Sequence, residues 1–271
     1  MWLIQQALEY GAPLFLISSP LTSYLDQILS IHRNRSSAGF SLDIPLIMLV
    51  ASILKVFYWF GEYYSKALLA QAIVMVVVQI ALLKVALDNR PAVGARNGIE
   101  HAPFTGGSPV GFQRPYDFWQ WRNTKPYWLF LAYFFAALFV LHLTPLSESA
   151  TYISTLGAVG LAVEAVLPLP QIIANHRSGS CKGFRVSVIA AWILGDVMKM
   201  SYFFCSQETI PWSFKICGIF QCICDLYLGF QYCLSVGLIP RTFIPSSSWA
   251  AGSSVNREGR WGQEEKDIRM T

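Results

Sequence analysis

The chain has 271 residues, of which 54% are apolar and only 13% are charged, and its mean hydropathy is +0.43. Soluble domains carry about 25% charged residues, so this composition excludes an ordinary water-soluble globule. The net charge of +4 is scattered rather than gathered into a basic block, which excludes a nucleic-acid partner. There is no glycine-rich phosphate loop, nucleophile motif or metal-ligand spacing among the six cysteines, so we expect neither an enzyme nor a cofactor or metal.

Seven stretches approach the roughly 20 apolar residues that cross a bilayer core. They cover residues 5–31, 42–61, 67–88, 126–143, 151–175, 186–205 and 212–237. We therefore predict an all-α integral membrane protein with seven transmembrane helices. The apolar beginning of the chain has no preceding lysine or arginine and no clean cleavage site, so we interpret it as part of the first span rather than a removable signal.

The basic residues are divided unequally between alternate loops. The loops 31–41, 89–125 and 176–185 and the C-terminal tail together hold 15 of the 20 lysines and arginines. The N-terminus and the three opposite loops hold one, Lys66. Because lysine and arginine near span ends stay on the cytosolic side, we predict a lumenal N-terminus and a cytosolic tail.

An internal repeat becomes visible when the sequence is shifted by 144 residues against itself. Residues 27–41 then align with 171–185, with seven identities in fifteen positions, and Lys55 aligns with Lys199. A repeat of this size indicates an internally duplicated fold. Each copy holds three helices, so the chain ends the first copy on the opposite side of the membrane from where it began. The single helix between the copies returns the chain to the starting side, so the second copy runs in the same direction as the first. We expect two parallel repeats with a site at their interface near the bilayer midplane.

This repeat predicts the organisation of the whole chain. The expected parts are a first three-helix repeat (1–88), a cytosolic loop (89–125), a linker helix (126–143), a second repeat (151–237) and a disordered cytosolic tail (240–271). The loop ends in a dense aromatic run, from Tyr116 to Trp121. Amphipathic rings beside a span are typical of the headgroup layer, where we expect these residues to lie.

The loop after the first helix of each repeat resembles the signature of the PQ-loop repeat family. The residues that carry the resemblance are Leu169, Pro170, Gln171, Asn175, His176, Arg177, Ser180, Gly183 and Phe184, with a first copy running from Gln27 to Ser41. The first copy departs from the pattern at Asp26, which stands in the place of the proline. Any kink in that helix must then come from Pro20 or Pro13.

Within this family the chain is similar to a Golgi and endosomal subgroup, on the run Phe118-Trp119-Gln120-Trp121 and on the segments around Asp196 and Asp225. That resemblance implies membrane phospholipids as partners, a functional link to the lipid flippases that the subgroup opposes, and lipid scrambling. Cystinosin-like relatives imply a different activity, proton-coupled transport of an amino acid or other small solute. The sugar-carrying branch shares the same fold.

Polar groups inside the spans predict a translocation pathway, because each charge costs at least about 2.5 kcal/mol at the bilayer centre. The predicted pathway residues are Asp26, Lys55, Glu164, Asp196, Lys199, Gln221 and Asp225. An alternative interpretation is a set of structural ion pairs, Asp196 with Lys199 and Lys55 with either Asp26 or Glu164. A polar seam of this kind fits both a lipid groove and a proton-coupled carrier.

Prolines inside the spans predict kinks in the helices that carry the motif glutamines Gln27 and Gln171. Proline has no backbone N–H and leaves the carbonyl four residues back without its helical donor. Pro20, Pro168 and Pro170 would release three carbonyls in this way. We interpret them as a hinge or polar lining at the repeat interface, and the alternative is a static kink relieved by packing.

Overall fold

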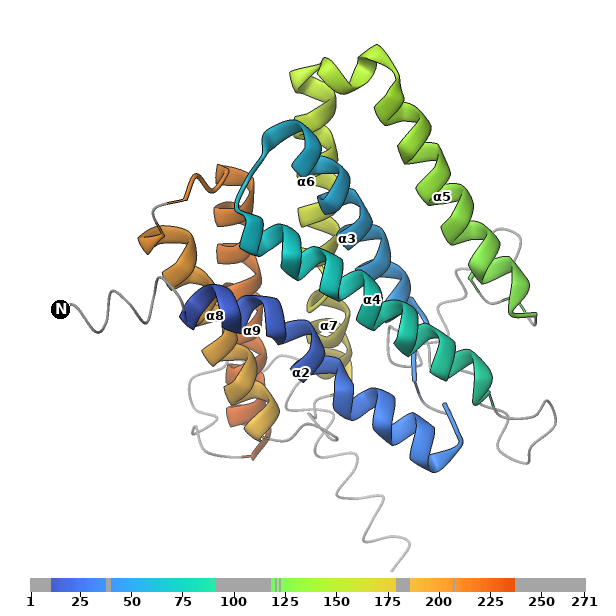
Figure 1. Cartoon of the computed structure of the whole chain (residues 1–271). Coiled ribbons are helices and arrows are strands. Elements are labelled where there is room, and N and C mark those ends of the chain that lie inside the picture. The colour runs from blue at the N-terminus through green and yellow to red at the C-terminus, as the bar shows by residue number, and fades with distance from the viewer. Residues whose placement is uncertain are drawn as a thin grey trace, which may run out of the picture.

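The computed structural model describes residues 11–37, 40–90, 118–119, 121, 123–178, 186–206 and 208–236. All the regular structure in these residues is helical (Figure 1). The elements are α2 (Ala12–Asn34), α3 (Asp43–Glu62), α4 (Lys66–Asp88), α5 (Lys125–Leu143), the short 3₁₀ helix η3 (Pro145–Glu148), α6 (Ala150–Ala165), α7 (Leu169–Ser178), α8 (Val186–Cys205) and α9 (Trp212–Val236). The expected tail and most of the loop before α5 lie outside the described residues.

Five helices in the described part of the chain are long and apolar enough to cross a membrane, which supports a multi-pass membrane protein. They are Asp43–Glu62, Lys66–Asp88, Lys125–Leu143, Ala150–Ile173 and Trp212–Ser235. α5 is the least buried of the five. A helix that is apolar all round and largely exposed fits contact with lipid.

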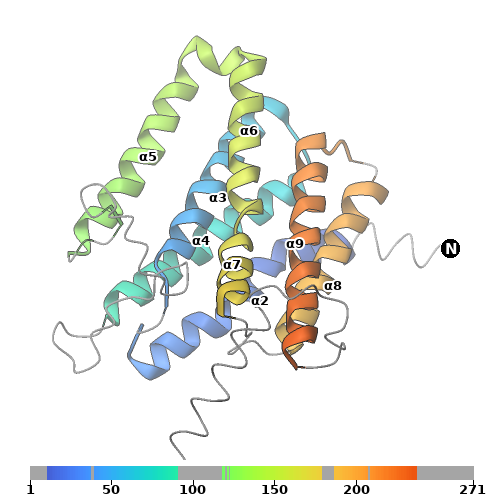
Figure 2. The same ribbon diagram turned by 180° about the vertical axis from the view of Figure 1, so that it is seen from behind.

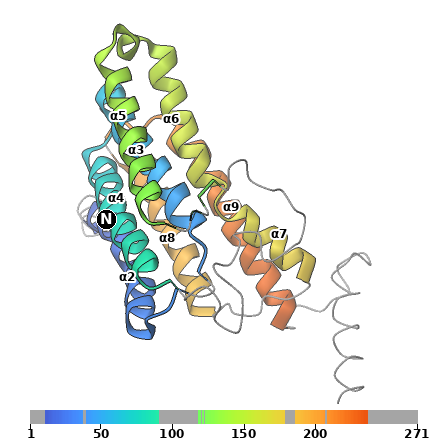
Figure 3. The same cartoon turned by 90° about the vertical axis from the view of Figure 1, so that its right-hand side faces the viewer.

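The helices pack in two groups of similar arrangement. α4 packs against both α2 and α3, and α9 packs against α6, α7 and α8. The groups meet mainly where α3 packs along α6, as seen from behind in Figure 2. α5 lies at the edge of the bundle, against α3, and η3 joins it to α6 at the end drawn uppermost in Figure 3.

Glycines allow α3 and α6 to approach closely. A Cβ added to Gly157 of α6 would lie 2.7 Å from the ring of Tyr58, and one added to Gly160 would lie 3.0 Å from the Cβ of Leu54. Small residues at a contact between membrane helices let the backbones come together. The close fit of α3 against α6 therefore depends on both glycines.

The helix expected over 151–175 is interrupted at residues 166–168. The interruption lies beside Pro168 and Pro170, which lack the N–H groups that would bond Glu164 and Val166. Each of these two carbonyls instead accepts the backbone N–H three residues further on, at 3.1 Å. Such bonds are typical of a tight 3₁₀ turn. Both carbonyls are thus satisfied within the chain.

The corresponding helix of the first copy, α2, runs without interruption past Pro20 and Asp26. The carbonyl of Leu16, which Pro20 leaves without a helical donor, accepts the hydroxyl of Ser19 at 2.8 Å. In α2 the carbonyl freed by proline is thus satisfied by a side-chain hydroxyl. Between α6 and α7 the freed carbonyls are satisfied by a change in the backbone hydrogen bonds.

Trp119, a member of the aromatic run before α5, is only 1% exposed and so packs inside the protein. Its Nε1 donates to the carbonyl of Leu42 at 2.7 Å. The hydroxyl of Tyr127 donates to the Trp119 carbonyl at 3.2 Å, and the Arg90 guanidinium lies 4.9 Å from the centre of the Tyr127 ring. Since the start of α3 offers an acceptor inside an apolar pocket, the indole can be buried with its N–H bonded.

Candidate functional site

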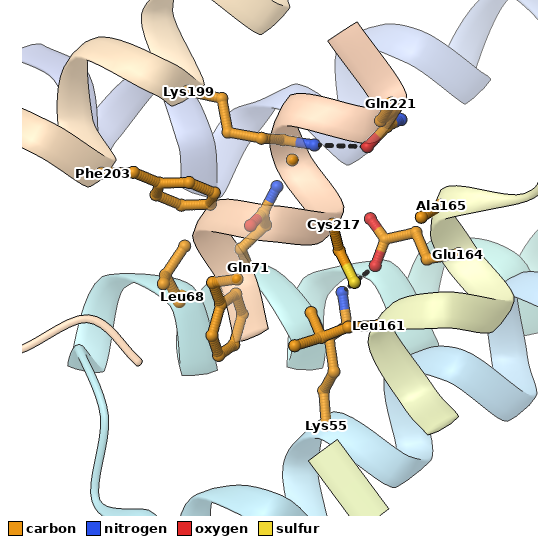
Figure 4. A pocket seen from close by; sticks show the side chains of 12 residues that line it. Lys55, Leu68, Gln71, Leu161, Glu164, Ala165, Lys199, Phe203, Cys217 and Gln221 are labelled. Carbon is orange, nitrogen blue, oxygen red and sulfur yellow. Dashed lines mark hydrogen bonds and ion pairs between the residues drawn. The ribbon is translucent and has the colours of Figure 1, made fainter. Parts of the chain in front are cut away.

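A small cavity of about 30 Å³ lies between the two groups of helices. Its polar lining includes Lys55 from α3, Glu164 from α6, Lys199 from α8 and Gln221 from α9, whose side chains converge in Figure 4. On this measure a water molecule needs about 10–15 Å³, so about two waters fit. In this conformation the cavity is too small for a lipid headgroup.

The strongest polar contact in the cavity joins the two groups of helices. Lys55 Nζ lies 2.5 Å from a carboxylate oxygen of Glu164, and the two side chains are 7% and 15% exposed. Buried charges are tolerated when they are paired in this way. The alternatives for Lys55 are thereby resolved in favour of Glu164 over Asp26.

Lys199 aligns with Lys55 in the internal repeat but has a different hydrogen-bond partner. Its Nζ donates to the amide oxygen of Gln221 at 2.9 Å. An amide accepts a hydrogen bond without neutralising the charge. The Glu164 carboxylate interacts electrostatically with both Lys55 and Lys199. The cavity lining therefore holds two cations for a single carboxylate.

Asp196 and Asp225 form a second polar cluster, on α8 and α9 beside the cavity. Both side chains are buried. Oδ2 of Asp196 has no hydrogen-bond partner in the part of the chain that the structure describes. Asp196 lies three residues from Lys199 and Asp225 lies four residues from Gln221, so each carboxyl group is about one helical turn from a residue of the cavity lining.

Asp26 and Gln27 lie apart from the other predicted residues, exposed on α2. The link from the cavity toward α2 is Gln71 of α4, which lines the cavity and donates to the hydroxyl of Ser19 at 3.4 Å. The structure thus brings four of the predicted pathway residues into one cavity and places two beside it, but separates Asp26 from them.

The motif glutamine Gln171 belongs to a chain of amides that ties α7 to α9. Its side chain donates to Asn175 at 2.8 Å, and Asn175 donates to Gln231 at 3.4 Å. Gln231 in turn donates to the carbonyl of Ile172 at 3.1 Å. These contacts hold the helix that follows the proline break.

At the end of the bundle near the α3–α4 connection, hydroxyl groups link the two groups of helices. The hydroxyls of Ser65 and Tyr202 are 2.6 Å apart, and Tyr202 donates to Glu208 at 2.9 Å. The hydroxyl of Tyr64 donates to the carbonyl of Lys55 at 2.9 Å. Burial raises the pKa of Tyr64, so this donor keeps its proton. The bonds close this end of the bundle.

Sequence reasoning missed Gln71, Gln231 and Ser65, because it weighed ionisable groups in the spans and few neutral ones. The sequence did contain a signal for Gln71 and Gln231, namely an amide side chain inside an apolar span. An amide in an apolar span must find a partner, just as a charge must. A search for buried amides would have found both.

Two segments of the chain, residues 18–68 and 152–212, match the family model of the PQ loop repeat. The chain is also similar to Scramblase ANY1 of Saccharomyces cerevisiae, with 29% identity over an alignment of 290 residues that covers 85% of this chain and 71% of the yeast protein. No solved structure matches the chain. Lys55 lies in the first matching segment, and Glu164 and Lys199 lie in the second. The charged lining of the cavity is thus built from both copies of the repeat.

Proposed function

Since the chain belongs to the PQ-loop repeat family, we propose that it is a phospholipid scramblase, which lets lipids cross between leaflets without coupling to an ion. The relative that is named a scramblase supports phospholipid as the substrate. The observation that carries the proposal is the buried Lys55–Glu164 pair beside Lys199, in a cavity between the two copies.

The charges of the cavity match those of a phospholipid headgroup. A lysine ammonium binds phosphate as a compact point charge, and a carboxylate binds the cationic end of a zwitterionic headgroup. Lys199, which has a neutral partner, is the cation most available to a phosphate. As a headgroup enters, the ion pair between Lys55 and Glu164 opens. Lys55 then binds the phosphate, and Glu164 binds the cationic group. The headgroup thus leaves water without losing polar partners, while the acyl chains stay in lipid.

The cavity must widen for this exchange, and the interruption between α6 and α7 supports a place where it does so. We assign the hinge to Pro168 and Pro170, because the helix is already interrupted there and the shorter turn bonds are readily exchanged. Gln171 and its amide partners then hold α7 to α9 as it moves. Pro20 stands inside α2 without interrupting it, so we expect the second copy to move more than the first.

We assign seven spans to the protein, α2 and α8 being added to the five most apolar ones. The two copies are parallel and are joined by α5, an arrangement that the similar packing of α4 and α9 supports. The charge asymmetry of the loops supports a lumenal N-terminus and a cytosolic C-terminus. In this orientation the bonds around Tyr202 close the lumenal end.

The subgroup resemblance supports a place in Golgi and endosomal membranes. Flippases there build an unequal lipid distribution between the leaflets, and a scramblase dissipates it. The protein then opposes flippases through the shared lipid pool, so no direct contact between the two proteins is needed.

A second candidate is proton-coupled transport of an amino acid or similar solute. The observation that favours it is the burial of two carboxyl groups, Asp196 and Asp225, on the helices that carry Lys199 and Gln221. A carrier of this kind would change the affinity of the pair for its proton as access alternates. Proton-driven uptake of amino acids into liposomes separates this activity from scrambling.

The test is a fluorescent-phospholipid assay with the purified full chain in liposomes. A membrane-impermeant bleaching reagent is added outside, with protein-free liposomes and an enclosed soluble dye as controls for leakage. Bleaching well beyond the outer half of the lipid, with the enclosed dye protected, supports scrambling. Bleaching that stops at half overturns it, and uptake of amino acids under a proton gradient then supports the carrier.

A further inference from the structure

One face of α2 is polar over most of its length. Residues three and four apart share a face of a helix. The polar face consists of Ser19, Thr22, Ser23, Asp26, Ser30 and Arg33. Ser19 is half-buried and the others are exposed, while exposed leucines such as Leu21 and Leu25 occupy the adjoining side. The outer surface of α2 is thus divided into a polar and an apolar strip.

Asp26 is the member of this face that hydrocarbon tolerates least. The hydroxyl of Thr22 donates to the carbonyl of Ser19 at 3.0 Å, and serine and threonine survive in lipid through such local bonds. A carboxylate has no donor, and Asp26 has no ion-pair partner among the described residues. An exposed charge inside a span is costly unless water or a polar group reaches it.

The second copy of the repeat has no such face. At the shift of 144 residues, the counterparts of Thr22, Ser23, Asp26 and Ser30 are Val166, Leu167, Pro170 and Ala174. All four counterparts are apolar. The polar face is therefore particular to α2 and does not follow from the repeat itself.

The polar face leads to the cavity between the two copies. Its innermost member, Ser19, accepts a hydrogen bond from Gln71, which lines the cavity. At its other end Arg33 stands in the last turn of α2. Asp26 and Arg33 are seven residues apart, or about 10 Å along a helix that rises 1.5 Å per residue. A carboxylate and a guanidinium are thus spaced along one continuous polar track.

The contact between α2 and α8 is less close than its counterpart between α3 and α6. Ala51 of α3 is fully buried, with its carbonyl 3.3 Å from a Cβ added to Gly160. Its counterpart on α8 is Gly195, where an added Cβ meets no atom of the described residues within 4 Å. Figure 1 shows α2 meeting α8 near its beginning and running away from it toward its other end. The bundle is therefore more open beside α2.

We propose that the polar face of α2 is one wall of a groove open to the bilayer, which takes zwitterionic phospholipid headgroups. Arg33 binds the phosphate, Asp26 binds the cationic amine, and the hydroxyls between them replace water. Ser19 and Gln71 lead the headgroup on to the cavity. The inference rests on the proposed function for the direction of travel, since it names the route and headgroup class of the scrambled lipid.

The test compares two sets of substitutions on opposite strips of α2. The first variant, Thr22→Leu/Ser23→Leu/Ser30→Leu, makes the polar strip apolar. The matched control, Leu21→Ser/Leu25→Ser, adds hydroxyls to the apolar strip. Retention of added phosphatidylethanolamine is measured by native mass spectrometry in detergent, and scrambling by the bleaching assay in liposomes. Circular dichroism and thermal unfolding establish that each variant folds.

We expect the leucine variant to retain and scramble phosphatidylethanolamine roughly fivefold less than the parent chain, a loss of about 1 kcal/mol. The serine control matches the parent in both assays. Parental lipid retention in the leucine variant overturns the groove. So does a change from dimer to monomer with lipid retention unchanged, because the strip would then be an interface between two copies.

A single substitution gives a second test should the triple variant not fold. Asp26→Asn should lower retention of phosphatidylethanolamine but leave that of phosphatidylglycerol, which lacks an amine. An equal effect on both lipids, or on neither, overturns the assignment of Asp26 to the amine.

The groove and the proposed function fail in distinguishable ways. If the parent chain does not scramble, but its retention of phosphatidylethanolamine depends on the polar strip, the groove is supported and the scramblase activity is overturned. If the parent chain scrambles and the leucine variant scrambles equally, the scramblase activity is supported and the groove is overturned.

Discussion

α2 and the α6–α7 pair lead the two PQ-loop matches, and they differ where the motif has its proline. The second copy carries Pro168 and Pro170 and is interrupted at residues 166–168. The first copy carries Asp26 at the position of Pro170 and forms one continuous helix. At this place one copy thus has an interrupted helix, and the other has an uninterrupted helix with a polar face. The same repeat accommodates two different helices at one position.

The equivalent lysines show the same divergence. Lys55 is neutralised by Glu164 across the contact between the copies, whereas Lys199 donates to the neutral Gln221. The first lysine is therefore paired with a carboxylate across the contact between the copies, and the second is bonded to an amide within one copy. Four predictions, ordered by expected effect, test this difference between the copies.

The largest effect is expected from Lys55→Met. Glu164 would be left buried without its partner, which costs about 3–5 kcal/mol. The matched change in the second copy, Lys199→Met, leaves only the neutral Gln221 unbonded and should cost less. Denaturant unfolding in detergent micelles measures both. Equal losses would contradict the difference between a lysine that is paired with a carboxylate and one that is bonded only to an amide.

A second prediction makes the first copy resemble the second. Asp26→Pro removes a backbone donor from the middle of α2 and should destabilise the protein by about 3 kcal/mol. Asp26→Ala is the control, because it removes the carboxylate and keeps the helix. Circular dichroism and thermal unfolding compare the two. A proline variant as stable as the alanine variant would mean that α2 tolerates a break here, as α6–α7 does.

A third prediction compares the two contacts between the copies. Gly160→Leu pushes a side chain against Leu54 and Ala51, and overpacking of this kind costs about 1–3 kcal/mol. Gly195→Leu enters open space, so the stability of the protein should not fall. If Gly195 borders the groove, the same change should slow scrambling. Loss of stability in both variants would show that the α2–α8 contact is as tight as the α3–α6 contact.

The smallest effect concerns the relief of proline in α2. Ser19→Ala leaves the carbonyl of Leu16 without a donor and should cost about 1 kcal/mol. Ser18→Ala removes an exposed hydroxyl bonded to the carbonyl of Phe15, which the helix already satisfies, and should be nearly neutral. Thermal unfolding of the two variants measures the difference. Equal stability would show that water or lipid can satisfy the Leu16 carbonyl instead.

Much of the fold could be predicted from hydropathy, because apolar length and loop composition are local properties. Within the described residues, six of the seven expected spans overlap one helix each, the span 151–175 overlaps both α6 and α7, and five are long and apolar enough to cross a membrane. The interruption at 166–168 was predictable only as a kink, since proline removes a donor but does not say how the chain satisfies the acceptor. The burial of Trp119 was not predictable, because its acceptor, the carbonyl of Leu42, is distant in the sequence.

The candidate site was predictable as a set of residue types but not as a set of contacts. The cost of charge in lipid identifies Lys55, Glu164 and Lys199 as interior residues. It does not choose between Asp26 and Glu164 as the partner of Lys55, because that choice depends on which helices pack together. Nor does it reveal that Asp26 lies on an outer face, since the rule assumes that every charge faces inward.

The most direct test of the account is scrambling by the double variant Lys55→Met/Glu164→Gln. Removing both charges together leaves neither member of the pair buried without its partner, so the protein should keep a stability closer to that of the parent than Lys55→Met does. If these charges exchange for those of a headgroup, the liposome bleaching assay should show strongly slowed scrambling by the folded variant. Parental scrambling by a stable, folded double variant would contradict the account and reduce the pair to a structural bond between the copies.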